Sequence, residues 1–126
     1  MRTVYRVTIT EDHVVPAKGE VLRQLDLLCR QVADRILDRA RRLMELPKHG
    51  RFYSRRGRVH QASAPGEPPA VDTGALYESL RVEKAGDADY LVGTGDEKAV
   101  WLEFGTRRMA ARPFLARAAR EVEREL

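Results

Sequence analysis

A helical stripe of apolar residues constrains the fold of this chain more than any other feature of its sequence. Between residues 18 and 46 the apolar positions follow one another at spacings of three, four or seven, which is the period of an amphipathic helix. Pro47 ends the helix, because the residue before a proline avoids the helical region. A helix of this length is roughly 40 Å long, so a small domain must be arranged along it. The stripe consists of Leu22, Leu25, Cys29, Val32, Ile36 and Leu43.

Two arrangements would bury this stripe. Its spacing fits the seam of a two-stranded coiled coil, and it also fits packing against a sheet of the same chain, which is the interpretation we prefer. The 126 residues are enough for one domain and leave no room for a second core. We therefore expect a single domain, residues 1–126, that covers the helix with its own strands.

Strand patterns occur on both sides of the helix. Residues 3–10 alternate between apolar and polar side chains, and so do residues 80–84 and 90–94, which a five-residue loop joins into a hairpin. A second amphipathic stripe follows Pro113, and proline is favoured in the first turn of a helix. These patterns predict an α+β fold, in which an antiparallel sheet packs against the long helix and against a C-terminal helix at 113–126.

A long connection, residues 48–71, separates the helix from the hairpin. It is too long for an ordinary loop, and Gly57 places a turn between two short strands, 51–54 and 59–62. The stretch 47–66 carries five basic residues and no acid, whereas the rest of the chain has 18 basic and 19 acidic residues. We expect an extended, mobile arm that is basic at its start and stiff at its prolines. Its candidate residues are Lys48, Arg51, Arg55, Arg56, Arg58, Pro65, Pro68 and Pro69.

Few residues suggest chemistry. Cys29 is the only cysteine, which excludes an intrachain disulfide and a zinc site with two thiolates, and its place on the stripe predicts a core residue. The three histidines lack the spacing of metal ligands. Glu103, beside Trp101 and Phe104, is expected to face water or to pair with an arginine. We therefore expect no enzyme, no cofactor and no metal.

No apolar run approaches the ~20 residues of a membrane span, and the N-terminus has the pattern of a strand rather than of a signal peptide. We expect no membrane partner and synthesis in a reducing cytoplasm. The arm leaves two interpretations open. Its arginines and the aromatic residues Phe52 and Tyr53 fit a DNA-binding module at 48–62, or else its charges keep a loop solvated or dock on a neighbour's acidic face.

Four pieces of sequence follow the long helix in a fixed order: a proline-rich lead-in at 65–69, Asp-Thr-Gly-x-Leu at 72–76, Glu-x-Gly-Thr at 103–106 and Pro-Phe-Leu at 113–115. Their order and spacing resemble the gene-product-ten-like family of neck or minor tail proteins of long-tailed phages. The resemblance covers roughly residues 18–126 and departs before Glu103, where tyrosine is more usual. The residues that carry it are Asp72, Thr73, Gly74, Leu76, Glu103, Gly105, Thr106, Pro113 and Phe114.

This resemblance implies a structural protein of the virion, made in the host cytoplasm and placed at the head–tail junction or in the tail. It implies a homo-oligomeric ring that connects head and tail, with other head-completion and tail proteins as partners and DNA passing through the channel. It implies no catalysis. In such a ring the segment 48–71 would be the arm that reaches a neighbouring subunit.

Two local expectations follow from the residues. Asp72 or Thr73 caps the free amides of a short helix at 74–80. Trp101, Phe104 and Phe114 form an aromatic cluster in the core beneath the long helix. The alternative for Trp101 is a contact anchor for the next subunit, because aromatic residues are enriched at the centres of interfaces.

Overall fold

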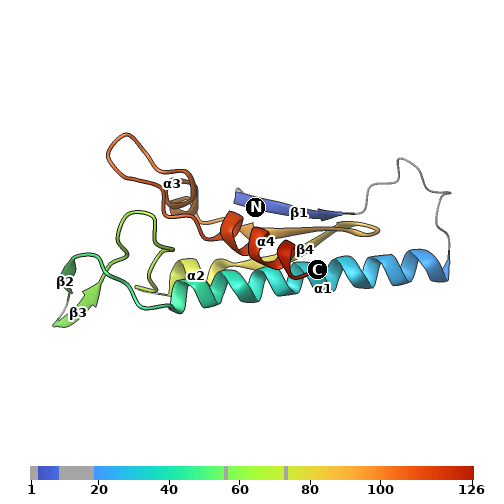
Figure 1. The fold of residues 1–126 in the computed structure, drawn as a ribbon, viewed down its shortest axis with the longest axis horizontal. Helices are drawn as coiled ribbons and strands as arrows, with labels where there is room; N and C mark the ends of the chain where they lie inside the picture. Colours follow the sequence, from blue (N-terminus) through green and yellow to red (C-terminus); the bar gives the residue numbers. More distant parts are fainter. Residues whose placement is uncertain (1–2, 9–18, 56, 73) are drawn as a thin grey trace.

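The computed structural model describes residues 3–8, 19–55, 57–72 and 74–126, and its axis is the helix α1 (Glu20–Glu45), which runs along the length of the molecule (Figure 1). The helix predicted at 18–46 is confirmed over Glu20–Glu45, and Lys18 lies outside the described residues. It ends at Leu46, which has extended backbone angles (φ −62°, ψ 152°) ahead of Pro47.

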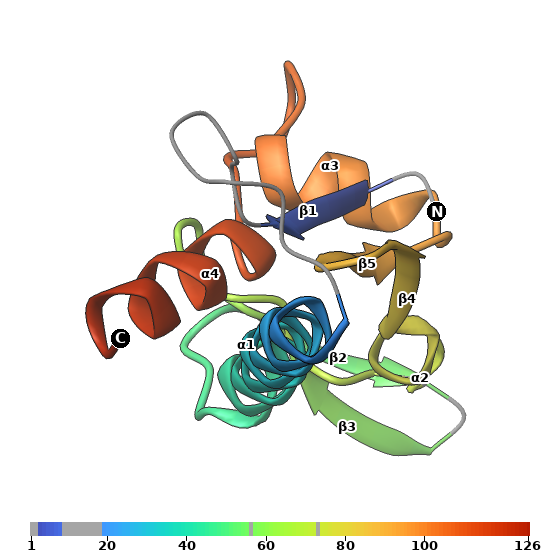
Figure 2. The same cartoon turned by 90° about the vertical axis from the view of Figure 1, so that its right-hand side faces the viewer.

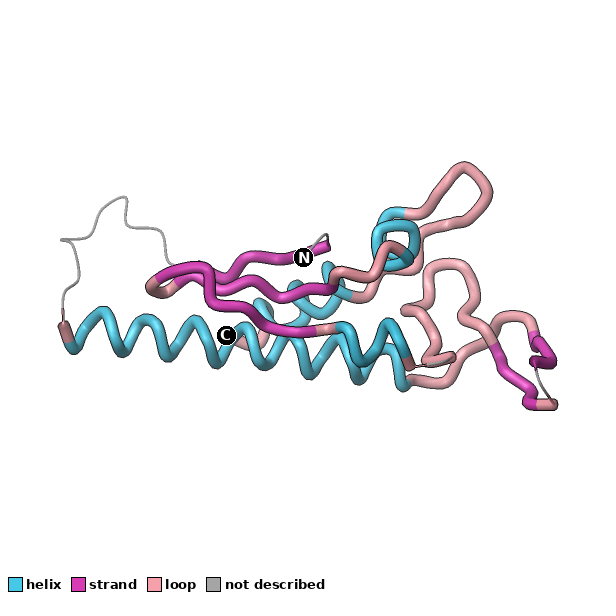
Figure 3. The backbone as a smooth tube through the Cα atoms, turned by 180° about the vertical axis from the view of Figure 1, so that it is seen from behind, coloured by secondary structure: helices cyan, strands magenta, loops and turns pink. Residues whose placement is uncertain are grey.

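One face of an antiparallel sheet packs against α1, and α4 packs beside α1 on the same side (Figure 2). The sheet has the strand order β1-β5-β4, so the first strand and the later hairpin pair as expected. Figure 3 shows these strands running alongside α1, and a separate two-stranded hairpin, β2–β3, lies beyond the end of the helix. The predicted α+β fold is confirmed. The remaining elements are β1 (Thr3–Thr8), β2 (Phe52–Arg55), β3 (Arg58–Gln61), α2 (Ala75–Ser79), β4 (Arg81–Gly86), β5 (Asp89–Thr94), α3 (Lys98–Phe104) and α4 (Leu115–Arg124).

The core forms where the apolar stripe of α1 contacts β5 and α4. Cys29 is 4% exposed and lies in this core, as predicted. The second half of the stripe is therefore buried within its own chain, whereas Leu22, Leu25 and Val32 are partly buried, and packing on the sheet rather than a coiled coil covers the buried part. The buried residues of the core are Cys29, Ala33, Ile36, Ala40, Leu43, Met44, Leu80, Ala88, Tyr90, Val92, Ala99, Phe114, Leu115, Ala118 and Val122.

The β4–β5 hairpin is tighter than its sequence suggested. We expected a five-residue loop, but the strands continue to Gly86 and from Asp89, which leaves a two-residue turn. Ala88 in this turn has a positive φ of 50°, a conformation that non-glycine residues adopt rarely. Asp26 of α1 supports the turn from outside: its carboxylate accepts the Ala88 N–H at 2.9 Å and the Tyr90 hydroxyl at 2.7 Å.

The hydrogen bond from the Ala88 N–H, followed by that from Tyr90, holds the pKa of Asp26 below its ordinary value. A carboxyl whose pKa is depressed by folding stabilises the fold above its unfolded pKa, about 4, and loses that contribution as the pH falls through the folded pKa. We expect Asp26→Asn to lower the melting temperature at pH 7 and to flatten the loss of stability between neutral and acid pH. Thermal melts across that range check this. Asp38→Asn, which breaks an exposed pair with Arg42 on the same helix, is the control and should change the profile little; equal profiles for both variants would contradict the assignment.

The expected aromatic cluster is divided. Phe114 is fully buried, as predicted, but Trp101 is 52% exposed and Phe104 is 70% exposed, so their core assignment is wrong. The reason is the helix α3, which the sequence pattern did not reveal. On a helix, residues four apart share a face, so Ala99 and Glu103 are buried together while Val100 and Phe104 lie outward.

Phe114→Ala should therefore destabilise the fold by about 3–5 kcal/mol, because it leaves a cavity among fully buried side chains. Trp101→Ala removes a larger side chain from the surface and should change the free energy of unfolding by no more than about 0.5 kcal/mol. Urea unfolding of the two variants measures the difference. Similar losses for both would show that Trp101 contributes to the core after all.

Candidate assembly surface

The buried carboxylate of Glu103 joins two pieces of the sequence motif. Glu103 lies on α3 and is 4% exposed. It accepts the backbone N–H groups of Phe114 at 3.1 Å, Leu115 at 3.1 Å and Ala116 at 2.7 Å. These groups open α4 and have no acceptor within the helix, and the residue before α4, Phe114, makes no side-chain cap. Glu103 thus caps α4 from another helix, and our expectation that it faces water or pairs with an arginine is wrong.

The same carboxylate binds the first strand. The Tyr5 hydroxyl of β1 donates to Glu103 Oε1 at 3.3 Å. Burial, reinforced by the negative charge of Glu103, raises the pKa of Tyr5 to about 12. Tyr5 therefore remains a neutral donor across the whole physiological range, and one carboxylate links β1, α3 and α4.

The turn after α3 brings these partners together. Gly105 has φ 76°, and a Cβ at this position would lie 2.8 Å from the Ala111 nitrogen and 2.9 Å from the Met109 oxygen, so only glycine fits. The Thr106 N–H donates to the Met109 oxygen at 2.8 Å and closes a tight turn. The chain then returns through Pro113, which is half-buried, to the buried Phe114. Glu-x-Gly-Thr and Pro-Phe-Leu therefore form one structural unit.

The Asp-Thr-Gly-x-Leu piece lies at the start of α2. The residue at the N-cap position is Gly74, with a left-handed φ of 90°, and the cap that we expected from Asp72 or Thr73 stays a prediction, because Thr73 lies outside the described residues. A glycine fits this conformation without strain, which explains its place in the motif. Asp72 lies 4.0 Å from His60 of β3, Leu76 packs on the core, and Thr73 is outside the described residues.

Removing the charge of Glu103 tests the capping role. Glu103→Gln retains the shape but presents an amide N–H₂ group to backbone donors, so we expect a loss of about 2 kcal/mol or more in the free energy of unfolding. Glu123→Gln, at an exposed position of α4, is the matched control. Urea unfolding and amide exchange at residues 114–116 report the effect. If these amides exchange no faster in Glu103→Gln, the cap is not what protects them.

The base of the arm 48–71 is fixed to the body. Lys48 is buried, and its Nζ donates to the Leu43 oxygen at 2.7 Å, where α1 has carbonyls without helical partners. Burial lowers the pKa of Lys48. Lys48 is therefore not one of the exposed cations of the arm, contrary to our expectation, but a C-terminal cap of the long helix.

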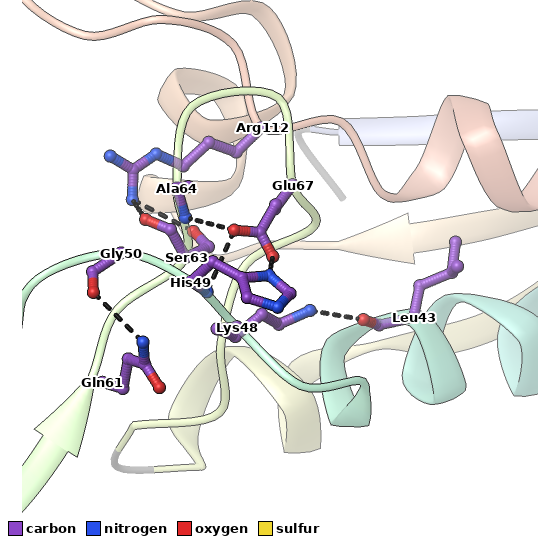
Figure 4. Close-up of polar contacts among 9 residues, drawn as sticks. All are labelled: Leu43, Lys48, His49, Gly50, Gln61, Ser63, Ala64, Glu67 and Arg112. Carbon is purple, nitrogen blue, oxygen red and sulfur yellow. Dashed lines mark hydrogen bonds and ion pairs between the residues drawn. The ribbon is translucent and has the colours of Figure 1, made fainter.

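Glu67 joins the start of the arm to its later part at the base, as Figure 4 shows. Its carboxylate accepts hydrogen bonds from the backbone N–H of His49 at 3.0 Å and from the backbone N–H of Ala64 at 3.0 Å. Its Oε2 also lies 3.1 Å from the Nδ1 of the His49 ring. Burial raises the pKa of Glu67, but these hydrogen bonds from Ala64 and His49 outweigh it and hold the pKa below its ordinary value. Arg112 adds a link to the returning chain, because its Nη1 donates to the Ser63 oxygen at 2.9 Å and to the Ser63 hydroxyl at 3.0 Å.

Beyond this base the β2–β3 hairpin extends past the end of α1 (Figures 1 and 3). The predicted pair of strands around Gly57 is confirmed. Phe52 pairs with Gln61 and Ser54 pairs with Val59, so Phe52 and Val59 share one face of the hairpin, where they are 67% and 74% exposed. A two-stranded hairpin is marginally stable by itself, and this apolar face lies open to a partner.

The structure places the other described arm residues in two environments. Arg51 and Arg58 are exposed near the hairpin, together with Pro65, whereas Pro68 and Pro69 are buried. The backbone of Arg55 belongs to β2, its side chain is not described, and Arg56 is outside the described residues. That the arm is the least ordered part of the isolated subunit stays a prediction.

Sequence reasoning missed Glu67 and Arg112. The sequence did contain a signal for Glu67, because Glu67 is the first carboxylate after the basic stretch and so the nearest charged hydrogen-bond acceptor along the chain. Arg112 had none, because Ser63 lies 49 residues away. Both residues hold the arm in place without taking part in its exposed surface.

A cavity of about 240 Å³ lies between the arm, α2 and α3. Its lining mixes apolar residues with His60, Asp72, Lys98 and Arg112, so charges of both signs face it. Among the residues that the structure describes, no group of three or more His, Cys, Asp or Glu side chains is placed to hold a metal ion. The helices of that same part of the chain also include none with the length and apolar character that a membrane crossing requires.

Comparisons with protein-family models, with curated proteins and with solved structures found no match to this chain.

Proposed function

We propose that this chain is a structural protein of a long-tailed phage virion, and that it assembles into a ring at the head–tail junction. The observation that supports the proposal most is the unit built around Glu103. The motif residues Glu103, Gly105 and Phe114 are joined by hydrogen bonds, a tight turn and burial, so the resemblance to neck and minor tail proteins rests on residues with structural roles.

A ring subunit needs two different surfaces, because a head-to-tail contact joins unlike patches and closes when the rotation between subunits allows it. The hairpin offers one such surface, with Phe52 and Val59 exposed on one face. The opposite end of the molecule exposes Val21, Leu27 and Leu28 on the first half of α1 (Figure 1). Placing these patches at opposite ends favours a head-to-tail contact over a two-fold one.

Charge favours the same arrangement. The stretch 47–66 has five basic residues and no acid, and the remainder of the chain has a net charge of −1, from 18 basic and 19 acidic residues. Lys48 is buried, so the exposed positive charge at the hairpin comes from arginines such as Arg51 and Arg58, which repel a second hairpin and favour contact with the body of the next subunit. We assign the arm to subunit contact, and the protein to connecting the head and the tail without catalysing a reaction.

The mass of the purified protein, measured by light scattering and native mass spectrometry, tests this function. We expect a closed oligomer, visible as rings by negative-stain electron microscopy. The double variant Phe52→Ser and Val59→Ser should weaken association by about 30-fold or more, the effect of losing an interface hot spot worth roughly 2 kcal/mol, and leave a folded monomer.

Leu126→Ser, which alters an apolar residue of similar exposure at the other end of the sequence, is the control and should leave the rings intact. A protein that remains monomeric at every concentration would refute the proposal. Open filaments would refute the closed ring, and rings that survive the double variant would show that the hairpin is not the contact.

A further inference from the structure

The aromatic side chains are distributed unevenly between the body and one end of the molecule. Tyr5, Tyr77, Tyr90 and Phe114 are buried or half-buried. In contrast, Phe52 and Tyr53 of β2 and Trp101 and Phe104 of α3 are each more than half exposed, and both elements lie at the hairpin end of the molecule (Figure 1). Phe52 shares its face with Val59 and fits a protein contact. Trp101 and Phe104 have different neighbours.

Those neighbours are cations. Lys98, Trp101 and Phe104 follow one another at a spacing of three along α3 and form a row on its surface. The chain then turns at Gly105, and the hydrogen-bonded pair Thr106–Met109 places Arg107 and Arg108 at the tip of a tight turn that projects from the molecule (Figures 1 and 2). A cation, two aromatic rings and two further cations thus line one exposed track.

The cations of this track differ from those of the body. Within the part of the chain that the structure describes, Lys98, Arg107 and Arg108 form no ion pair. Many cations of the body are instead paired with carboxylates of the same chain. These pairs are Arg6–Asp89, Arg23–Glu20, Arg30–Asp34, Arg35–Glu125, Arg39–Glu125, Arg42–Asp38, Arg81–Glu83, Lys84–Asp26, Lys84–Asp87 and Arg117–Glu121.

We propose that this track, Lys98–Trp101–Phe104 with Arg107 and Arg108, binds single-stranded nucleic acid. Unpaired bases stack on the exposed rings of Trp101 and Phe104, and phosphates contact the guanidinium and ammonium groups. A duplex hides the faces of its bases, so it satisfies only the cations. Asp96 and Glu97 precede the row, and their carboxylates repel phosphates, so we expect the strand to run from Lys98 toward the arginine turn.

This surface is distinct from the segment 48–62 to which the sequence assigned nucleic-acid binding. Lys48 of that segment is buried, and Phe52 belongs to an apolar face. The track is also independent of the proposed ring, because its chemistry does not depend on the oligomeric state. The two proposals therefore stand or fall by different measurements.

Trp101 is the only tryptophan, so its fluorescence reports the site directly. We expect an oligothymidine of about 20 nucleotides to quench this fluorescence at low salt, and a labelled copy to gain anisotropy. Trp101→Ala should weaken binding roughly 5- to 150-fold, the loss of one stacked base, while Trp101→Phe retains most of the affinity.

The double variant Arg107→Ala and Arg108→Ala should reduce the slope of log affinity against log salt by about 1.4, for two lost phosphate contacts to a single strand. Arg30→Ala with Arg42→Ala removes the same charge from exposed, ion-paired positions of α1 and should leave both slope and quenching unchanged. Thermal melts check that all variants fold, which we expect because every altered side chain is on the surface.

Several outcomes would overturn the proposal. One is that oligothymidine does not quench the Trp101 fluorescence. A second is that the control variant loses as much affinity as the track variants. A third is that a duplex of the same length binds as tightly as the single strand without quenching. If Trp101→Ala retains nucleic-acid affinity but no longer forms rings, the track is a subunit interface instead. A wild-type protein that binds oligothymidine but stays monomeric would refute the ring and leave this inference standing.

Discussion

The contact between Glu103 and the start of α4 is the interaction on which the C-terminal third of the fold depends. A buried carboxylate is costly unless its charge is compensated, and here three backbone N–H groups and the positive end of a helix compensate it. The arrangement is mutual, because those N–H groups would also be buried without acceptors if Glu103 were lost. One residue thereby fixes α3 to α4 and, through Tyr5, to the edge strand β1.

Regular periodicity explains what the sequence predicted. The long helix and the strands of the main sheet repeat at 3.6 and 2 residues over enough positions to be recognised, and the structure confirms them. The helix α3 has seven residues, Lys98–Phe104, which is too short for its period to separate from a run of apolar residues. For this reason Trp101 and Phe104 were assigned to the core, although they lie on the outer face.

Long-range hydrogen bonds explain most of the rest. The cap of α4 comes from Glu103 rather than from the residues before the helix, so the local signature of a helix start is missing. The two-residue turn at Ala88 depends on Asp26, 62 residues away in sequence. For the candidate site, the sequence located the motif and the basic hairpin, but it did not show that Lys48 caps the long helix or that Arg107 and Arg108 lie exposed in the turn after α3.

The close approach of Gly50 to the backbone of Ala62 and Ser63 determines how a mechanical force on the hairpin reaches the rest of the molecule. A Cβ there would lie 2.5 Å from the carbonyl oxygens of Ala62 and Ser63, so the two legs of the hairpin touch backbone to backbone at this point. Gly50 and Ala62 are also joined by a hydrogen bond of 3.0 Å. A pull on the hairpin tip therefore does not separate the legs one after the other. The tension passes together through Lys48 into α1 and through Ser63 and Arg112 toward α4, so a force at the tip is shared by both helices of the body.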